Sequence, residues 1–388
     1  MLVLKNGKVL PMAGEEFTGD IAVENGKIKA LGKNLSYSGA KEIDLGGRYV
    51  LPGFVDAHCH IGMWEDGIRE EGDDGNEMSN PVTPELRAID AINPYDRCFS
   101  EAREAGVTTC VTGPGSANVI GGQFVAMKTF GSCMEDMILR FPVAMKMAFG
   151  ENPKRVYKSQ KATPQTRMAT AGVLRKALTG AAEYIKKIED AGDDKSKLPE
   201  RDLGKEMLVQ VLKRELPVKI HAHRSDDILT AIRVAKEFNI RFSIEHCTEG
   251  YMIPDLIKQA VKEQGMGVII GPLLSERSKV ELKNLTFKAP KVLYDNGIEF
   301  AMMTDHPVIP EQYLPVCAAL AVREGLPEDV ALKSITINAA RVTGIDDRVG
   351  SLEVGKDADV AVFSGHPLDF RSRCVLTLIN GEMVHSEL

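Results

Sequence analysis

Two histidines, His58 and His60, end a mostly apolar run that follows the turn at 51–53. Because side chains alternate between the two faces of a β-strand, both imidazoles would project from one face and could reach one metal ion. Neutral imidazole is a common ligand of zinc and similar divalent ions. A lone His-x-His pair also occurs at ordinary strand ends, so its meaning depends on the rest of the chain.

Other residues that could bind a metal also stand at the ends of apolar runs. His221 and His223 end one run, His246 ends the next, and Asp305 ends the last. In a β/α barrel the carboxyl ends of the strands converge on one mouth, where active sites lie. We therefore expect these side chains to meet, although they are far apart in the chain.

The middle of the chain alternates short apolar runs with stretches of helical periodicity. This pattern predicts a (β/α)8 TIM-like barrel over residues 51–345. An open doubly wound sheet is the alternative, but no glycine-rich nucleotide-binding turn follows the first run. The expected barrel strands include the opening run at 54–60, a less distinct run at 124–127, and those at 107–112, 142–149, 217–223, 241–246, 267–270 and 300–305.

Alternating runs separated by Asn-Gly pairs occur at both ends of the chain, at 6–7, 25–26 and 380–381. Asn-Gly between such runs is a strong hairpin signal, since both residues tolerate positive φ. Neither end has enough strands to bury a core alone. We expect residues 1–50 and 346–388 to form one small composite β-sandwich domain.

Bulk properties narrow the class of protein. The chain has 388 residues, 44% of them hydrophobic and 27% charged, which suits a barrel with a modest second domain. No apolar run could span a membrane, and the start lacks signal-peptide features, so we expect a cytoplasmic protein. Seven scattered cysteines argue against disulfides, and a net charge of -7 argues against nucleic acid. Small molecules are the expected partners, and homo-oligomerisation stays open.

Two segments interrupt the alternation. Residues 64–80 form an acidic, glycine-rich loop directly after His60, consistent with a lid or specificity element or with an ordinary surface excursion. Residues 151–213 hold helical stretches and a charged tract at 189–206 that is typical of a solvated linker or helix face. Arg167 in this insertion could hold a substrate carboxylate through two hydrogen bonds.

The order of the candidate ligands, the segment at 49–58 and the tail segments at 335–344 and 350–360 resemble the metal-dependent amidohydrolase superfamily over essentially the whole chain. The subgroup that the chain most resembles is the imidazolonepropionase-like one. The resemblance implies one or two divalent ions, with zinc expected. His58, His60 and Asp305 would bind a first ion and His221 and His246 a second. Asp305 would also accept a proton from water and pass it to the leaving amine.

Members of the superfamily with two metal ions need an anionic bridge, often a carboxylated lysine on the fourth strand. Lys146 lies in that place, and a bare ammonium buried between two methionines would be costly, which favours carboxylation. Glu151, at the end of the same run, is the alternative bridge. If neither bridges, the site holds one metal. His223 is expected to support the site or contact substrate, and His306 to point away.

The resemblance implies a hydrolase that cleaves a carbon–nitrogen bond in a cyclic amide, a dipeptide or an acylated amine, using a metal-activated hydroxide. A ring deaminase with a single metal is the nearest alternative. An alternative of another class is a non-catalytic barrel scaffold, against which stands the presence of all five expected ligands. The sequence does not identify the substrate.

Overall fold

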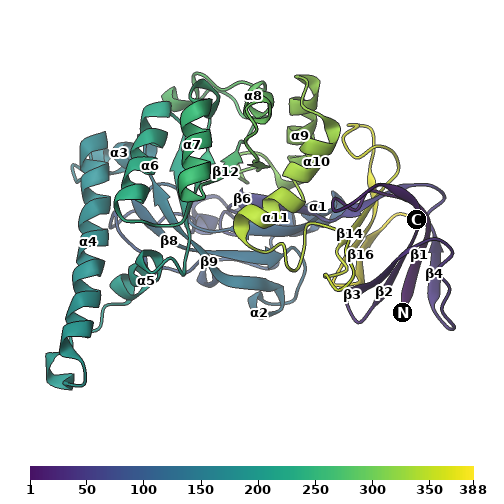
Figure 1. Ribbon diagram of the computed structural model, residues 1–388, viewed down its shortest axis with the longest axis horizontal. Coiled ribbons are helices and arrows are strands. Elements are labelled where there is room, and N and C mark those ends of the chain that lie inside the picture. Colours follow the sequence, from purple (N-terminus) through teal and green to yellow (C-terminus); the bar gives the residue numbers. More distant parts are fainter.

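The computed structural model describes residues 1–388, which form an eight-stranded barrel sheet and a second sheet beside it (Figure 1). Along the barrel sheet the strands follow one another in chain order, and the last lies beside the first. Backbone hydrogen bonds from Asp305 N to His58 O (3.2 Å) and from His60 N to His306 O (2.9 Å) join these two ends. The barrel strands are β6 (Phe54–Cys59), β7 (Val107–Thr112), β8 (Ile120–Lys128), β9 (Ile138–Ala148), β10 (Val218–Ala222), β11 (Phe242–His246), β12 (Gly267–Ile270) and β13 (Ala301–Met302).

The expected eight barrel strands are thus confirmed, but they are not eight β/α units. Strand β8 runs antiparallel to both β7 and β9. A parallel neighbour needs a crossover of a dozen or more residues. Only residues 113–119 join β7 to β8, and 129–137 join β8 to β9, so both connections are too short for a crossover.

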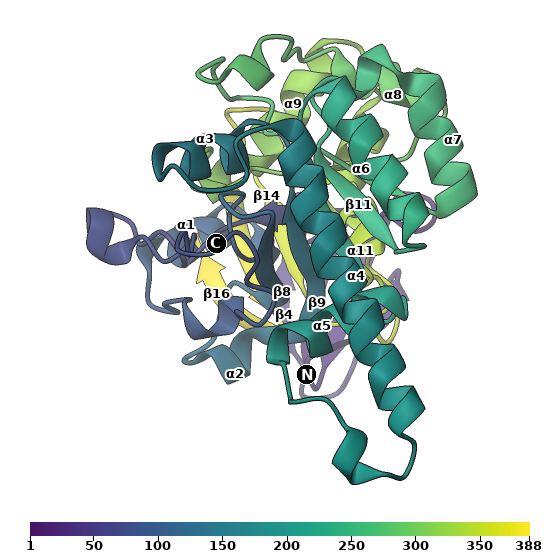
Figure 2. The same ribbon diagram turned by 90° about the vertical axis from the view of Figure 1, so that its left-hand side faces the viewer.

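Helices pack against the outer face of the barrel, where a cluster of 59 buried residues forms the main core. A separate cluster of 14 residues, most of them from six barrel strands and α11, fills the interior below the mouth. Helix α4 extends beyond the barrel, and the charged tract at its far end lies exposed at the tip (Figure 2). The α-helices are α1 (Arg97–Glu104), α2 (Met134–Met137), α3 (Glu151–Ser159), α4 (Arg167–Ala191), α5 (Leu203–Leu212), α6 (Ser225–Glu237), α7 (Pro254–Gln264), α8 (Ala289–Asp295), α9 (Leu314–Arg323), α10 (Glu328–Ser334) and α11 (Ile337–Thr343). The 3-10 helices are η1 (Arg69–Gly72), η2 (Ala88–Asp90), η3 (Lys195–Lys197), η4 (Gly250–Met252), η5 (Val280–Leu282) and η6 (Glu311–Tyr313).

The second sheet draws its strands from both ends of the chain, as expected. Strand β5 pairs with β14 in antiparallel fashion, and 14 buried residues from both ends share one apolar cluster. The domain limits at 1–50 with 346–388 and at 51–345 stay predictions. The strands are β1 (Leu2–Val9), β2 (Phe17–Glu24), β3 (Lys27–Gly32), β4 (Lys41–Asp44), β5 (Tyr49–Pro52), β14 (Val360–Phe363), β15 (Cys374–Ile379) and β16 (Glu382–Ser386).

Two of the three Asn-Gly pairs form the expected tight turns. Both residues have positive φ at 25–26 and at 380–381. The pair at 6–7 lies inside β1 instead, where the register with β2 shifts. A Cβ on Gly7 would come 2.5 Å from Val50 Cγ2, so this glycine serves close packing.

All seven cysteines are free, as the sequence predicts. None of the helices combines the length and apolarity that crossing a membrane requires.

Candidate metal centre

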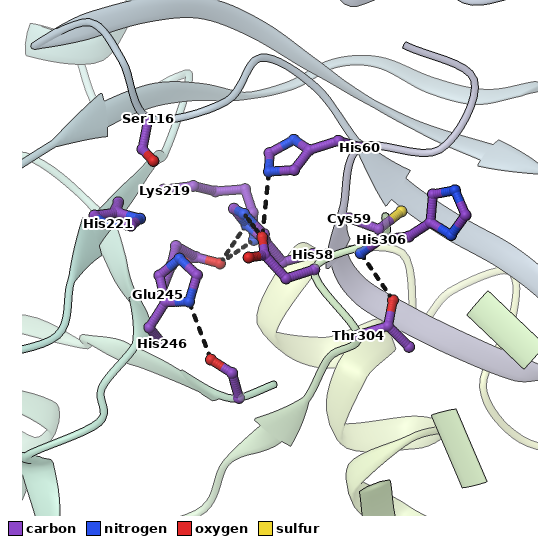
Figure 3. A network of polar contacts seen from close by, with 12 residues as sticks. His58, Cys59, His60, Ser116, Lys219, His221, Glu245, His246, Thr304 and His306 are labelled. Carbon is purple, nitrogen blue, oxygen red and sulfur yellow. Dashed lines mark hydrogen bonds and ion pairs between the residues drawn. The ribbon is translucent and has the colours of Figure 1, made fainter. Parts of the chain in front are cut away.

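The barrel brings the expected ligands from four strand ends together at its mouth (Figure 3). Asp305 Oδ1 lies 3.2 Å from His60 Nε2 and 3.6 Å from His58 Nε2. The ligand atoms of His58, His246 and Asp305 all lie within 4.8 Å of one another. Burial alone would raise the pKa of Asp305, but His60 and Lys146 hold it below its usual value, so this carboxylate is ionised.

A second group, His221, His223 and His246, adjoins the first. Their ligand atoms also lie within 4.8 Å of one another. Nδ1 of His246 lies 3.0 Å from Gly271 O, which leaves its Nε2 for the mouth. Neither ring nitrogen of His221 has a hydrogen-bond partner, although the residue is buried.

Backbone conformation helps to aim two of these side chains. His246 has a φ of 71° and Asp305 a φ of 57°, both in the left-handed region. This conformation costs a residue with a Cβ roughly 1–3 kcal/mol and is concentrated at functional sites. Neighbouring residues of a regular strand point to opposite faces, and Glu245 points inward. Because the φ of His246 is positive, its side chain still reaches the mouth.

A buried ion pair supports His58 from below. Glu245 Oε2 lies 2.8 Å from His58 Nδ1 and 2.9 Å from Lys219 Nζ. Lys219 also donates to Ala57 O at 3.0 Å. A carboxylate this close favours the tautomer with its proton on Nδ1, which leaves Nε2 for the metal position, although the contact lacks hydrogen-bond geometry. Sequence reasoning missed Glu245 and Lys219, although each shares a strand with an expected ligand.

Lys146 lies where the bridging residue was expected. Its Nζ is 3.2 Å from His58 Nε2, and the side chain is fully buried without an ion pair to a carboxylate. Burial lowers the pKa of Lys146 to about 8, so a substantial share of the amine is neutral near that pH. A neutral amine is the form that reacts with carbon dioxide. The position therefore fits carboxylation, and the bridging role stays a prediction.

Glu151 and Arg167 each bind another part of the protein. Glu151 exchanges hydrogen bonds with Glu281: Glu151 N donates to Glu281 Oε2 at 2.9 Å, and Glu281 N donates to Glu151 Oε2 at 3.4 Å. Glu151 makes no ion pair with a histidine. Arg167 donates from Nε and Nη2 to Asp227 at 2.9–3.1 Å. The Arg167 guanidinium is therefore already paired with the Asp227 carboxylate. Its contact with a substrate carboxylate stays a prediction.

Glu281, in η5 after β12, was not predicted as a site residue. Its side chain is buried, and Oε1 lies 3.6 Å from His221 Nε2 and 3.7 Å from His223 Nε2. No strand pattern marks this position in the sequence. His306 points away from the mouth, as expected, where its Nδ1 accepts a hydrogen bond from Glu311 N at 3.2 Å.

The acidic loop at 64–80 begins against the site. The Trp64 and His60 rings meet edge to face with centroids 5.1 Å apart. A Cβ on Gly75 would come 1.9 Å from the Trp64 ring, so glycine is required where the loop returns. The Asn76 side chain accepts a hydrogen bond from Ala117 N at 3.0 Å. The loop is thus anchored beside the expected ligands.

The donor set fits a divalent ion. Buried ring nitrogens of His221 and His246 and the buried Glu281 Oε1 have no hydrogen-bond partner, which is costly unless a cation binds them. Burial, together with the Lys146 and Lys219 ammonium groups, holds the pKa of His58 well below its usual value. His58 is therefore neutral, as a metal ligand must be. Imidazole and carboxylate together suit zinc and similar ions.

Comparisons with known proteins agree with this geometry. A family model described as "Amidohydrolase family" matches residues 49–384. An amidohydrolase from Thermotoga maritima MSB8 is 44% identical, with a TM-score of 0.96 and coverage of 100% of both chains. A 5-methylthioadenosine/S-adenosylhomocysteine deaminase from Desulforudis audaxviator (strain MP104C) is 24% identical over 93% of this chain and 84% of its own.

The amidohydrolase tasK from Hapsidospora irregularis is 29% identical over 94% of this chain, and the chain spans 39% of the length of that relative. The match at 49–384 covers most of the chain, including every expected ligand. The resemblance inferred from the histidine order is therefore confirmed, and this chain belongs to the amidohydrolase family.

Proposed function

We propose that the chain is a metal-dependent hydrolase that cleaves a carbon–nitrogen bond of a cyclic amide, a dipeptide or an acylated amine. The observation that carries this proposal is the convergence of His58, His60, His221, His246 and Asp305 at one end of the barrel. Zinc as the ion, the imidazolonepropionase-like subgroup and a cytoplasmic location remain predictions.

A divalent ion in this site would lower the pKa of water from 15.7 to roughly 7 and polarise the scissile carbonyl. Asp305 would take a proton from the attacking water and return it to the leaving nitrogen. Its Oδ1 stands between His58 and His60, at 3.6 and 3.2 Å from their Nε2 atoms. Glu245 holds His58, and Gly113 O, 2.6 Å from Nδ1, holds His60.

The test is a substrate panel of dipeptides, acylated amines, cyclic amides and aminopurines, assayed before and after chelation and after zinc is restored. We expect release of an amine or opening of a cyclic amide, lost on chelation and recovered with zinc. Ammonia release from the aminopurines alone would replace the proposal with the deaminase alternative. A protein that binds no divalent ion after reconstitution would favour the scaffold.

Lys146 and Glu151 can be separated as bridging residues by reconstituting metal-free protein with and without bicarbonate. If Lys146 bridges as a carbamate, bicarbonate is expected to raise the bound metal toward two equivalents, and Lys146→Gln should abolish this response. Metal content would be measured by plasma mass spectrometry. Binding that ignores bicarbonate but falls in Glu151→Gln would contradict the carbamate and identify Glu151 as the bridge.

A further inference from the structure

The carboxylate of Glu281 is held in a defined position beside two histidines. Its Oε2 accepts a hydrogen bond from Glu151 N at 2.9 Å, at the start of α3. Gly150 before it has a φ of 88°, and a Cβ there would lie 2.7 Å from Glu281 Oε2. A side chain at position 150 would therefore push this carboxylate away. The close approach depends on glycine.

The other oxygen, Oε1, is buried and has no hydrogen-bond partner. It faces His221 Nε2 at 3.6 Å and His223 Nε2 at 3.7 Å, beyond hydrogen-bond distance from both. Two donors that bind one tetrahedral zinc at about 2.1 Å lie about 3.4 Å apart. The two observed separations are close to this value.

His223 is oriented toward the same point. Its Nδ1 lies 2.8 Å from the Thr248 hydroxyl, which leaves Nε2 directed to Glu281. Its ring is nearly parallel to that of His246, with centroids 4.2 Å apart, so one of the two rings must turn for both Nε2 atoms to bind the same ion. The residue is buried, as His221, His246 and Glu281 are. The ligand atoms of the three histidines thus lie within 4.8 Å of one another, and the Glu281 carboxylate faces two of them.

We propose that His223 and Glu281 join His221 and His246 as direct ligands of one divalent ion, giving it three imidazoles and a carboxylate from the loop after β12. This inference rests on the metal-dependent function proposed above and extends the ligand set that the sequence implied. It replaces the substrate contact expected for His223. The carboxylate would offset part of the ion's charge without the Lys146 bridge.

The test compares the full-length protein with Glu281→Gln and His223→Gln, using zinc and cobalt titrations in the absence of substrate. We expect the affinity of each variant for the ion at this site to fall by more than roughly 100-fold. Loss of a hydrogen-bond partner that only supports a ligand costs roughly 10–100-fold. The visible absorption bands of the cobalt form should change in both variants. Glu276→Gln is the matched control, because Glu276 is an exposed glutamate in the same loop, and it should behave as the wild type.

Thermal unfolding of the metal-free forms shows whether each variant folds. If Glu281→Gln does not fold, His223→Gln alone provides the test. Unchanged zinc affinity and an unchanged cobalt spectrum in a folded Glu281→Gln variant would overturn the inference while leaving the proposed function intact. An equal loss in Glu276→Gln would also overturn it, since the effect would then come from the loop. A wild-type protein that binds neither metal would instead overturn the proposed function.

Discussion

Replacing Asp305 with asparagine is expected to lower kcat by at least about 10²-fold, because asparagine cannot accept and return the proton. The carboxylate faces His58 and His60 at the barrel mouth, and one of its oxygens lies 3.2 Å from His60 Nε2. The substitution keeps the shape of the side chain, so the fold should be retained. The measurement is kcat on the best substrate of the panel, with thermal unfolding as the check on folding.

Asp295→Asn is the matched control, since Asp295 is an exposed aspartate at the end of α8. This variant should keep wild-type kcat. Near-normal turnover in a folded, metal-loaded Asp305→Asn protein would show that the proton moves through another group.

Replacing Lys219 with methionine is expected to lower the free energy of unfolding of the metal-free protein by about 3–5 kcal/mol. The change would leave the fully buried Glu245 carboxylate without its cation, which lies 2.9 Å away. Adding Glu245→Gln should recover most of the loss, because the buried charge is then removed as well. Urea unfolding of both single variants and the double variant measures this coupling.

The exposed pair of Asp329 and Lys333 on α10, 3.0 Å apart, provides the comparison. Lys333→Met should change the free energy of unfolding by less than about 1 kcal/mol, as is usual for solvent-exposed pairs. A similarly small change in Lys219→Met would contradict the buried ion pair between Lys219 and Glu245, and the support assigned to His58 would then be wrong.

Much of this arrangement could be predicted because barrel strands encode their own positions. Each buried strand appears in the sequence as an apolar run, and the polar residue at its end lies at the mouth. This pattern predicted the position of His58, His221, His246 and Asp305 at the mouth. The Asn-Gly turns predicted hairpins at 25–26 and 380–381 through the positive φ that they require.

Other features left no mark in the sequence pattern. An apolar run does not show whether a strand is parallel or antiparallel to its neighbours. Only the short connections on either side of β8 explain why it is antiparallel. Simple alternation along a strand would place His246 and Glu245 on opposite faces. Because the φ of His246 is positive, both side chains point into the barrel. Glu281 lies in a loop without periodicity, and its approach to His221 depends on how the loop after β12 folds.

The most direct test of the metal centre is an anomalous difference map from a crystal of zinc-loaded protein, recorded at the zinc absorption edge. We predict a peak at the barrel mouth within about 2.0–2.2 Å of ligand atoms of the expected histidines and Asp305. A crystal that contains zinc elsewhere but shows no peak among His58, His60, His221, His246 and Asp305 would contradict the assignment of this mouth as a metal-dependent active site.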